Sequence, residues 1–333
     1  ATPPYTYLWN NGQTSSSLAG VSVGTYTCII TDDTLCTTTQ SVTIYEPTPL
    51  TAALISTDSV NCNGGSDGGA EIIATGSTPS YSYTWTNGQT GPVISSVTAG
   101  TYNCNIQDYN GCSINFSVDI EEPLPLTTVG NITSNYNGRD VSCYGASNGS
   151  AFVQSSGGTP SYVYSWNNGQ SGQTLTNVGA GTYNCTVSDH YGCTDNFQIQ
   201  ISQPDSIVAN SIPIDIRCNG GSDGQVIGNV TGGTSPYTYN WSNGIVNPST
   251  SSPNSIIGLS LGTYSFTVYD ANNCSKSSNV VTINQPSPLI SSVINVDSVS
   301  CNGGSDGGSL VTGQGATPPY TYLWNNGQTS SSL

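Results

Sequence analysis

The sequence predicts an all-β protein made of tandem immunoglobulin-like antiparallel β-sandwich repeats arranged as a linear fibre. Three observations support this prediction: a repeat of about 80 residues, short runs in which apolar and polar residues alternate, and turn residues at intervals of about 8–12 positions. The composition agrees, because only 7% of the 333 residues are charged, while Thr, Val, Ile and Tyr, which favour strands, are frequent.

The repeat is clearest around the five tryptophans, each of which lies in a Tyr-x-Tyr-x-Trp-x-Asn-Gly sequence. They are Trp9, Trp85, Trp166, Trp241 and Trp324, and they recur at nearly even intervals. A cysteine lies at one fixed distance before each Trp after the first, and a Gly-Thr-Tyr follows each of the first four. Features that recur at this spacing indicate one domain per repeat.

Glu-Pro or Gln-Pro closes each repeat and supplies the predicted boundaries. The predicted domains are 47–122, 123–203 and 204–285, with the C-terminal part of a repeat at 1–46 and the N-terminal part of one at 286–333. Residues 1–18 and 316–333 are identical, so the sequence of Ala1 and its neighbours begins again at Ala316. We therefore expect the chain to be a window from a longer tandem array, in which 286–333 supplies the early strands of a sandwich and 1–46 its later ones.

Within the repeat 47–122, the expected strands follow one another between turn signals. In the clearest of them, GTYNCNIQD, the side chains of Tyr102, Cys104 and Ile106 lie on one face by the two-residue period of a strand. The expected strand segments are 50–60, 70–75, 78–88, 100–108 and 116–123, with a Gly-rich turn at 63–69. About seven such strands in a domain of this size form a sandwich with one modest core.

The Trp of the third strand and the Tyr of Gly-Thr-Tyr are expected to anchor the core, because they occupy fixed positions on strands. The rings expected to be mostly buried are Trp85, Trp166, Trp241, Tyr102, Tyr183 and Tyr264. A sugar-binding face formed by these rings is the alternative. A Tyr two residues before a Cys also fits the tyrosine corner of immunoglobulin domains.

The charge excludes two classes of partner. Lys and Arg total 3 against 19 Asp and Glu, which gives a net charge of −16. Nucleic acids and anionic membrane surfaces are bound by clustered basic residues, so neither is an expected partner. No stretch approaches the roughly 18 apolar residues of a membrane span, so no membrane insertion is expected.

A CNGGSDG turn, a Tyr-rich Trp-x-Asn-Gly block and a Gln-Pro terminus together resemble the SprB repeat of giant cell-surface adhesins in gliding bacteria. The resemblance covers all four repeats, closely at 62–69, 218–224 and 301–308 and more loosely at 143–149, CYGASNG. It implies a secreted, cell-surface filament that serves adhesion or gliding motility, with further copies of its own repeat as partners, in tandem or end to end. The family is defined by scaffold residues, so the resemblance implies no catalytic residue, and we expect neither an enzyme nor a cofactor.

The 11 cysteines fall into three classes. The first class precedes the Gly-rich turn, the second follows Gly-Thr-Tyr, and the third ends the next turn. The repeat 204–285 has Phe266 in place of a second-class cysteine yet keeps the other two, so the first and third classes are the expected partners. The disulfide candidates are Cys62, Cys143, Cys218 and Cys301 of the first class, and Cys36, Cys112, Cys193 and Cys274 of the third. Metal binding is not expected, because neither a CxxC pair nor a neighbouring His recurs.

Three arrangements of these cysteines remain open. In an immunoglobulin topology the first class lies between strands A and B and the third lies just past the F–G turn. These positions are on the order of 25 Å apart for a strand of about eight residues, whereas a disulfide needs Cα atoms within roughly 7 Å. Repeats stacked end to end would pair Cys62 with Cys193 and Cys143 with Cys274. Pairing within a repeat, as Cys62 with Cys112, and unpaired thiols are the alternatives.

The second-class cysteines are expected to point inward as buried free thiols, because the repeat 204–285 has Phe at this position. They are Cys28, Cys104 and Cys185. A cross-link between chains is the alternative.

Other candidate sites rest on single residues in turns. His190 lies where the other repeats have Asp33, Tyr109 and Ala271, so we expect a surface position and no catalysis. The turn aspartates are expected to bond their own backbone, with Ca²⁺ binding as the alternative. They are Asp32, Asp67, Asp108, Asp189, Asp223, Asp270 and Asp306.

Four Asp-Ser/Thr-apolar tripeptides resemble the O-glycan acceptor of the bacterial group whose adhesins the chain resembles. The O-glycosylation candidates are Thr34, Ser59, Ser206 and Ser298.

The sequence therefore predicts a structural region of an extracellular filament. The alternative function is a module that binds glycans or matrix through its loops, with surface glycans as the partner. The insertion NPSTSSP at 247–253 is the clearest loop difference between repeats.

Overall fold

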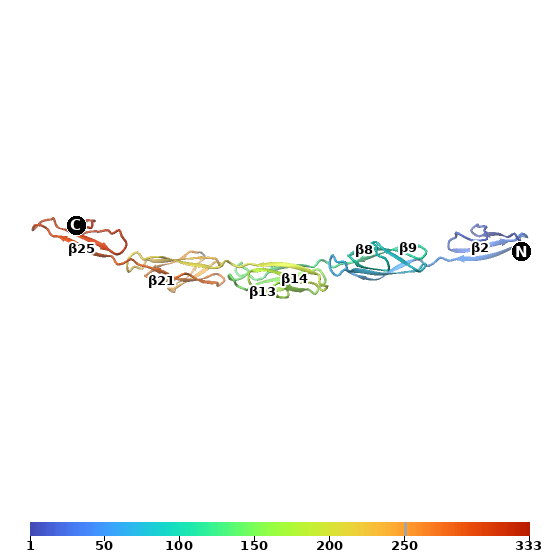
Figure 1. Ribbon diagram of the computed structural model, residues 1–333, viewed down its shortest axis with the longest axis horizontal. Helices are drawn as coiled ribbons and strands as arrows, with labels where there is room; N and C mark the ends of the chain where they lie inside the picture. Colours follow the sequence, from blue (N-terminus) through green and yellow to red (C-terminus); the bar gives the residue numbers. More distant parts are fainter. Residues whose placement is uncertain (250–251) are drawn as a thin grey trace. The chain divides into compact units, whose positions relative to one another are not determined.

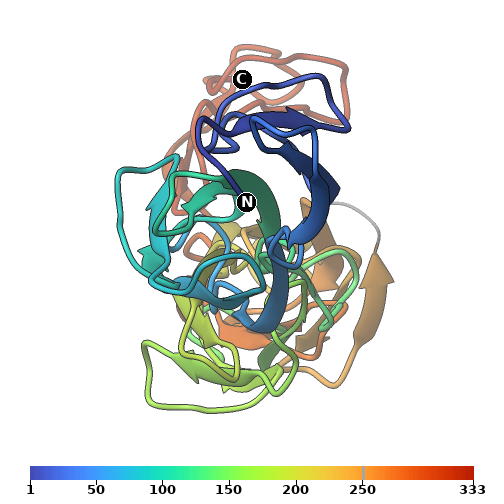
Figure 2. The same cartoon turned by 90° about the vertical axis from the view of Figure 1, so that its right-hand side faces the viewer.

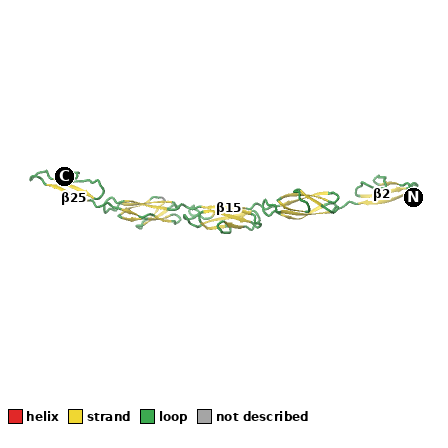
Figure 3. Ribbon diagram, viewed as in Figure 1, coloured by secondary structure: helices red, strands yellow, loops and turns green. Residues whose placement is uncertain are grey.

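The structure is a computed structural model that describes residues 1–249 and 252–333, with 250–251 drawn as a thin grey trace in Figures 1 and 2. Every regular element in the described residues is a β-strand, and Figure 3 shows strands and loops alone. The prediction of tandem antiparallel β-sandwiches is confirmed. Among the described residues there is no helix that could cross a membrane.

The chain divides into two compact units. The first consists of Ala1–Thr127, Gly157–Ser161 and Asp189–Cys193, and the second of Thr128–Ser156, Tyr162–Ser188 and Thr194–Leu333. Two loops of the repeat 123–203 therefore group with the preceding repeat. This division follows contacts and not the sequence repeat, so the predicted domain boundaries stay a prediction.

The repeat 47–122 is a sandwich of two three-stranded antiparallel sheets, β4-β5-β7 and β6-β8-β9. The strands are β4 (Thr51–Asp58), β5 (Gly68–Thr75), β6 (Ser82–Trp85), β7 (Val93–Val97), β8 (Gly100–Gln107) and β9 (Ser113–Ile120), of which β8 and β9 are labelled in Figure 1. In immunoglobulin nomenclature these are strands A, B and E on one sheet and C, F and G on the other.

This repeat has six strands, so the expectation of about seven was wrong. The chain leaves β6 through a tight turn, in which the Trp85 N–H donates to the Gln89 carbonyl and the Gly88 N–H donates to the Trp85 carbonyl, both at 2.9 Å. Only the single bridge Thr84–Thr90 follows before β7 begins. The short connection leaves no room for the strand D found in immunoglobulin domains.

The repeat 123–203 has the same arrangement. Its sheets are β10-β11-β13 and β12-β14-β15. The strands are β10 (Thr127–Ile132), β11 (Gly149–Ser156), β12 (Val163–Trp166), β13 (Thr174–Val178), β14 (Gly181–Ser188) and β15 (Thr194–Ile201).

The repeat 204–285 adds an edge strand next to strand C. Its sheets are β16-β17-β20, β19-β18-β22-β23 and β21-β24, so strands F and G are each interrupted once. The strands are β16 (Val208–Ile214), β17 (Gly224–Thr231), β18 (Tyr237–Trp241), β19 (Val246–Ser249), β20 (Asn254–Leu259), β21 (Gly262–Tyr264), β22 (Phe266–Tyr269), β23 (Ser275–Ser277) and β24 (Val281–Ile283). The inserted residues 247–249 belong to the edge strand β19, and 250–251 of the insertion lie outside the described residues.

The two outer segments each form one sheet. In 1–46 the antiparallel order β1-β2-β3 corresponds to strands C, F and G, and in 286–333 the pair β25-β26 corresponds to strands A and B. These strands are β1 (Thr6–Trp9), β2 (Gly24–Thr31), β3 (Thr37–Ile44), β25 (Ile290–Asp297) and β26 (Gly308–Gln314).

The predicted tryptophan anchors are confirmed. Trp85 and Trp166 are 2% exposed and Trp241 is 3% exposed. The tyrosines of Gly-Thr-Tyr pack against the cores and are mostly buried, as expected, although less deeply than the tryptophans. The reason is that the ring of Tyr102 lies at the margin of the core and its hydroxyl donates to the Thr98 carbonyl at 3.0 Å. The same bond to the residue four positions earlier recurs at Tyr26, Tyr183 and Tyr264. This is the geometry of a tyrosine corner.

The second-class thiols lie in the core, as expected. Cys104 and Cys185 are fully buried, Cys28 is 2% exposed, and all three are free. Burial raises the pKa of the Cys104 and Cys185 thiols, against a smaller opposing effect of a backbone hydrogen bond at each. A buried thiol held protonated behaves as a small apolar group.

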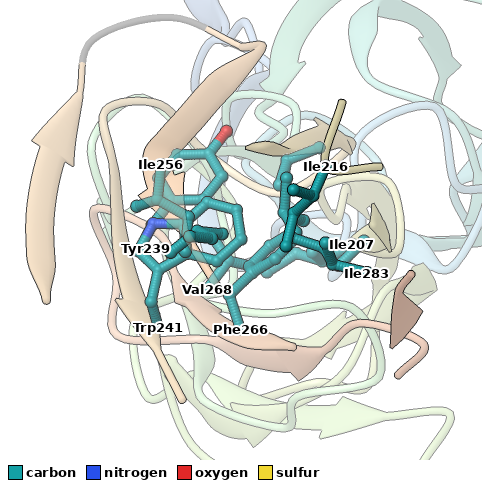
Figure 4. Close-up of a cluster of buried hydrophobic side chains, with 12 residues drawn as sticks. Ile207, Ile216, Tyr239, Trp241, Ile256, Phe266, Val268 and Ile283 are labelled. Atoms are coloured by element: carbon teal, nitrogen blue, oxygen red, sulfur yellow. The ribbon is translucent and has the colours of Figure 1, made fainter. Parts of the chain in front are cut away.

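Phe266 occupies the corresponding position in the repeat 204–285, and the facing strand compensates for its size. Figure 4 shows Phe266 with Tyr239 and Trp241; its ring centre lies 5.2 Å from that of Tyr239 and 4.8 Å from that of Trp241. A Cβ at Gly228 would lie 2.8 Å from the Phe266 ring. In the repeat 47–122 the residue that corresponds to Gly228 is the buried Ile72, opposite the small Cys104. A large residue on one strand is thus matched by a small one on the other.

A glycine at the end of strand B recurs where the chain passes close to the start of strand A. Gly76 has φ +84°, and a Cβ there would lie 2.0 Å from the Pro49 carbonyl oxygen. Gly157, Gly232 and Gly315 show the same approach to a carbonyl oxygen, at 1.9, 2.1 and 2.0 Å. Only glycine fits both the left-handed backbone and this approach.

We predict that Gly76→Ala destabilises the repeat 47–122 more than Gly88→Ala. Gly88 has nearly the same φ, +85°, but nothing lies within 4 Å of its Cβ position. The control therefore carries the backbone strain alone, about 1–2 kcal/mol, and Gly76→Ala adds roughly 1–3 kcal/mol for the overlap. Urea unfolding of both variants measures the difference, and equal losses would contradict the close approach.

We also predict that Phe266 and Gly228 compensate each other. Phe266→Cys leaves a cavity and costs roughly 2–4 kcal/mol, while Gly228→Ile alone clashes with the ring and costs roughly 1–3 kcal/mol. The double variant reproduces the pair of the repeat 47–122 and should be more stable than either single variant. Thermal unfolding of the two single variants and the double variant gives a double-mutant cycle. If the losses of stability of the two single variants simply added in the double variant, the pairing would be refuted.

Candidate functional site at the repeat junctions

Two disulfide bonds join loops of successive repeats. Cys62 is bonded to Cys193 and Cys143 to Cys274, with Cα–Cα distances of 5.6 and 5.7 Å. Each bond links the A–B loop of one repeat to the F–G turn of the next. Of the three arrangements that the sequence left open, the structure contains the one across the junction.

The other four disulfide candidates, Cys36, Cys112, Cys218 and Cys301, are exposed free thiols in the described part of the chain. The pairing of Cys62 with Cys112 is therefore not formed. A bond needs the A–B loop of one repeat and the F–G turn of the next repeat. Cys218 and Cys301 lie in A–B loops, whereas Cys36 and Cys112 lie in F–G turns. The segment 286–333 contains neither strand F nor strand G, and 1–46 contains neither A nor B.

Several hydrogen bonds hold the A–B loop that carries Cys62. Asp67 accepts from the Asn61 N–H at 3.1 Å. The Gly64 N–H donates to Glu122 at 2.6 Å, and the Asn63 side-chain amide donates to the Pro123 carbonyl at 3.1 Å.

The last two of these bonds explain why Glu-Pro or Gln-Pro closes each repeat. Gln203 accepts from the Gly145 N–H and Gln285 from the Gly220 N–H, both at 2.8 Å. The residue before the boundary proline therefore fastens the end of strand G to the A–B loop. Asn219 and Gly220 of an A–B loop likewise donate to Pro286 and Gln285, although the two pairs lie far apart in the sequence.

A buried aspartate holds the F–G turn that carries Cys193. Asp189 is 5% exposed and accepts backbone N–H bonds from Thr159 at 2.8 Å, from Tyr191 at 3.0 Å and from Cys193 at 2.9 Å. The carboxylate thus ties the F–G turn to the loop before strand C and fixes the backbone of the bonding cysteine.

An aspartate at the same position is present in each of the other F–G turns. Asp32, Asp108 and Asp270 accept N–H bonds from Cys36, Cys112 and Cys274 at 2.9, 2.8 and 2.9 Å. The structure therefore shows these aspartates bonded to backbone N–H groups of their own turns, as the sequence predicts. In the described residues, no three His, Cys, Asp or Glu side chains are grouped so that they could hold a metal ion.

Hydrogen bonding lowers the pKa of three of these carboxyl groups below the ordinary value of 3.8. At Asp108 the largest cause is the Ser77 hydroxyl, and at Asp32 it is the Thr2 N–H. At Asp189 burial is the largest single influence and raises the pKa, but four backbone N–H groups together outweigh it. These groups remain ionised in the folded state at neutral pH.

The second junction contains contacts that the sequence analysis missed. The Asn272 side-chain amide donates to the carbonyls of Tyr136 and Ser142 at 3.2 and 3.1 Å, and the Asn137 amide donates to the Ala271 carbonyl at 3.3 Å. Tyr136 and Asn137 belong to extra residues in the A–B connection of the repeat 123–203. The signal for them is that Trp166 follows Trp85 at a longer interval than Trp85 follows Trp9, although the interval from Cys143 to Trp166 is unchanged.

The remaining predicted site residues are His190 and the O-glycosylation candidates, of which Ser206 lines a pocket beside Cys143 and Cys274. His190 is exposed, and its ring packs edge-on against Tyr191 with 5.0 Å between the ring centres. The O-glycosylation candidates Thr34, Ser59, Ser206 and Ser298 are all exposed. The Thr34 hydroxyl donates to Asp32 at 2.8 Å.

We predict that acid destabilises the turns through these carboxylates. Because the folded-state pKa of Asp108 lies below its unfolded value, its contribution to stability is complete above about pH 4 and is lost as the pH falls through the folded-state pKa. Asp108→Asn should lower stability at pH 7 and weaken the loss of stability between pH 5 and pH 2. Urea unfolding across this range measures both effects.

Asp119→Asn is the matched control, because Asp119 is exposed on β9 and accepts from the Thr101 hydroxyl. A pH profile of Asp108→Asn as steep as that of the unchanged protein would contradict this role of Asp108.

The comparison with protein families gives one match. The model described as SprB repeat matches residues 54–90, 135–171, 210–245 and 293–329. Each match runs from strand A through the A–B loop to the Trp-x-Asn-Gly turn. It therefore contains the first-class cysteine and the Trp of Trp-x-Asn-Gly, which is buried in the first three matches. No curated protein matches the chain.

Solved structures of tandem immunoglobulin-like domains are distantly similar. Three N-terminal domains of the bacteriophage RB49 highly immunogenic outer capsid protein share 13% identity over 71% of this chain and 97% of that chain, with a TM-score of 0.34. A C-terminal fragment of intimin, solved with the intimin-binding domain of its translocated receptor, shares 19% identity over 50% and 67%, with a TM-score of 0.28. A Dscam structure on isoform specificity shares 13% identity over 85% and 92%, with a TM-score of 0.24.

These structural likenesses are too distant to support an inference about function. The four family matches lie one in each of the repeats 47–122, 123–203 and 204–285 and one in the segment 286–333, at the spacing of the tryptophans. Four segments of the chain therefore match the SprB repeat model.

Proposed function

We propose that this chain is a structural region of an extracellular adhesin, a tandem array that transmits tension along a bacterial surface filament. The observation that carries the proposal is the disulfide between the A–B loop of one repeat and the F–G turn of the next. Ordinary tandem domains are joined by a linker alone, which extends under load. Here a second covalent connection parallels the linker at both junctions.

The two bonds interlock along the chain. The segment from Cys62 to Cys193 overlaps the segment from Cys143 to Cys274, and each spans a sequence separation of 131 residues. Tension applied at the ends passes through both pairs of sulfur atoms and the short segment 143–193 between them, so residues 62–143 and 193–274 cannot be drawn out to full length even if a sandwich unfolds. Such a scheme suits a protein that holds a cell to a surface.

Disulfides persist in oxidising compartments, which supports a secreted protein. We propose a linear fibre in which each repeat touches mainly its neighbours, as in other tandem arrays. The SprB family supports a setting in adhesion or gliding motility. Lys and Arg total only 3, so few trypsin-like cleavage sites are present, which suits exposure outside the cell.

We further propose O-glycans on Thr34, Ser59, Ser206 and Ser298, which are exposed as a modified residue must be. The proposal includes no cofactor and no catalysis. The aspartates considered as calcium ligands are occupied by N–H donors, and His190 is paired with an aromatic ring and not with a nucleophile.

Binding of glycans through the loops remains the weaker proposal. The F–G loop, which is one of the binding loops of an immunoglobulin variable domain, is used here by the disulfides. The edge strand β19, which includes part of the inserted loop, is the clearest difference between repeats that could still serve glycan binding.

We predict that reduction lengthens the protein under tension. The whole chain is tethered at its termini and stretched in optical tweezers until every sandwich is unfolded. In a Cys143→Ser variant, which keeps the Cys62–Cys193 bond, reducing agent should release the 131 enclosed residues, roughly 450 Å of extended chain.

The double variant Cys62→Ser/Cys143→Ser is the control and should reach full length without reducing agent. If the Cys143→Ser variant also reached full length without it, the junction would not bear tension and the proposed function would lose its main support.

A further inference from the structure

Three segments of the chain connect the same two disulfide bonds. They are 62–143, 143–193 and 193–274, and each begins at one bond and ends at the other, so the three are joined in parallel. The segment 143–193 is the shortest, roughly 170 Å when fully extended against roughly 280 Å for each of the others. While 143–193 stays folded, unfolding of the two longer segments therefore adds no length between the bonds.

The segment 143–193 contains strands B, C, E and F of the repeat 123–203. These are β11, β12, β13 and β14, whereas strands A and G, which are β10 and β15, lie in the two longer segments. Of the buried apolar side chains in the core of this repeat, only Val141, Ile199 and Ile201 lie outside 143–193. Most of the packing that stabilises the repeat thus lies within the segment that becomes taut first.

Tension enters this segment through the central strand of each sheet. β11 follows Cys143 and lies between β10 and β13, while β14 precedes Cys193 and lies between β12 and β15. β14 is paired with β15 along all of Gly181–Ser188 and with β12 at 185–188. A central strand leaves its sheet only when both of its hydrogen-bond ladders break, whereas an edge strand such as β10 or β15 is held by one.

The two central strands are pulled in opposite directions along their axes. β13 ends at Val178 and β14 begins at Gly181, and this short connection makes β14 antiparallel to β13. β11 is also antiparallel to β13, so β11 and β14 run in the same direction. Because Cys143 precedes the start of β11 and Cys193 follows the end of β14, tension shears both sheets. Shear loads the hydrogen bonds of a ladder together, whereas peeling breaks them one at a time.

The repeat 204–285 is less well satisfied than the repeat before it, and most of it lies in the shielded segment 193–274. Trp166 Nε1 donates to a backbone carbonyl at 3.0 Å. The corresponding Trp241 Nε1 and the hydroxyl of Tyr239 are buried without a hydrogen-bond partner in the described residues. Buried polar atoms without a partner destabilise a fold. We therefore expect this repeat to unfold before its neighbour.

We propose that the segment 143–193 limits the extension of both neighbouring repeats, so that the distance between the two bonds is kept while the enclosed parts of those repeats unfold and refold. The inference rests on the proposed function, since it requires tension along the chain. It deepens that function by naming the element that bears the tension. Without the bonds, each repeat is loaded through its own edge strands A and G, and the least stable repeat lengthens first.

The test stretches the whole chain of residues 1–333 by its termini in optical tweezers at constant force. The variants are Val187→Ala and Val268→Ala. Both valines are fully buried at the same position of strand F, on β14 and β22, but only Val187 lies within 143–193. Each substitution removes the same atoms from a core, so each should speed the unfolding of its own repeat.

In the chain with both bonds, Val187→Ala should speed the release of 143–193, a step of at most roughly 170 Å, about tenfold or more. Val268→Ala should leave the rate of this step unchanged, because its repeat is shielded. The variant Cys62→Ser/Cys143→Ser, which has neither bond, is the matched background. There both substitutions should speed lengthening alike, in steps of roughly 280 Å for a whole repeat.

An effect of Val268→Ala that is as large in the bonded chain as in the background without bonds would overturn the proposal, because 193–274 would then bear the tension. Absence of an effect of Val187→Ala in the bonded chain would overturn it as well. Either result would leave the two bonds in place, and with them the proposed function. The proposed function fails by a different result, full extension of the Cys143→Ser variant without reducing agent.

Discussion

The bond between an A–B cysteine and the F–G cysteine of the next repeat is the constraint on which the rest of the structure depends. It requires two loops from different repeats to bring their Cα atoms within roughly 7 Å. Asp189 fixes the F–G turn through three backbone N–H groups, and Asp67 and Glu122 fix the A–B loop. These carboxylates explain most of the repeat's sequence signature, since they stand in the turn after strand F, in Asn-Gly-Gly-Ser-Asp-Gly and before the boundary proline.

The sandwiches themselves are small, and their cores tolerate exchange as long as volume is conserved. The Trp of strand C stays in place in each intact repeat, while the pair Ile72 and Cys104 gives way to Gly228 and Phe266. A close-packed core accepts such a change only when the facing residues change together. The polar turns of the junction therefore recur from repeat to repeat, whereas the interior varies by compensation.

Much of this could be predicted from the sequence, because periodic features report on backbone geometry. The sandwich fold, the inward Cys104 and the buried Trp85 follow from alternation and spacing. Alternation also places Tyr102 on the inner face, but it does not give the distance of this residue from the margin of the core. The absent strand D depends on a turn closed by two backbone hydrogen bonds, and the role of Gly228 depends on a ring from a strand that is distant in the sequence. The local pattern of apolar and polar residues does not reveal contacts of that kind.

Disulfide mapping of the protein tests the central claim most directly. The chain is digested without reduction, and the linked peptides are identified by mass before and after reduction. We expect one pair of peptides that contains Cys62 and Cys193 and another that contains Cys143 and Cys274. A peptide pair that joins Cys62 to Cys112, or quantitative alkylation of Cys62 and Cys193 without reduction, would show that the repeats are not bonded across their junctions.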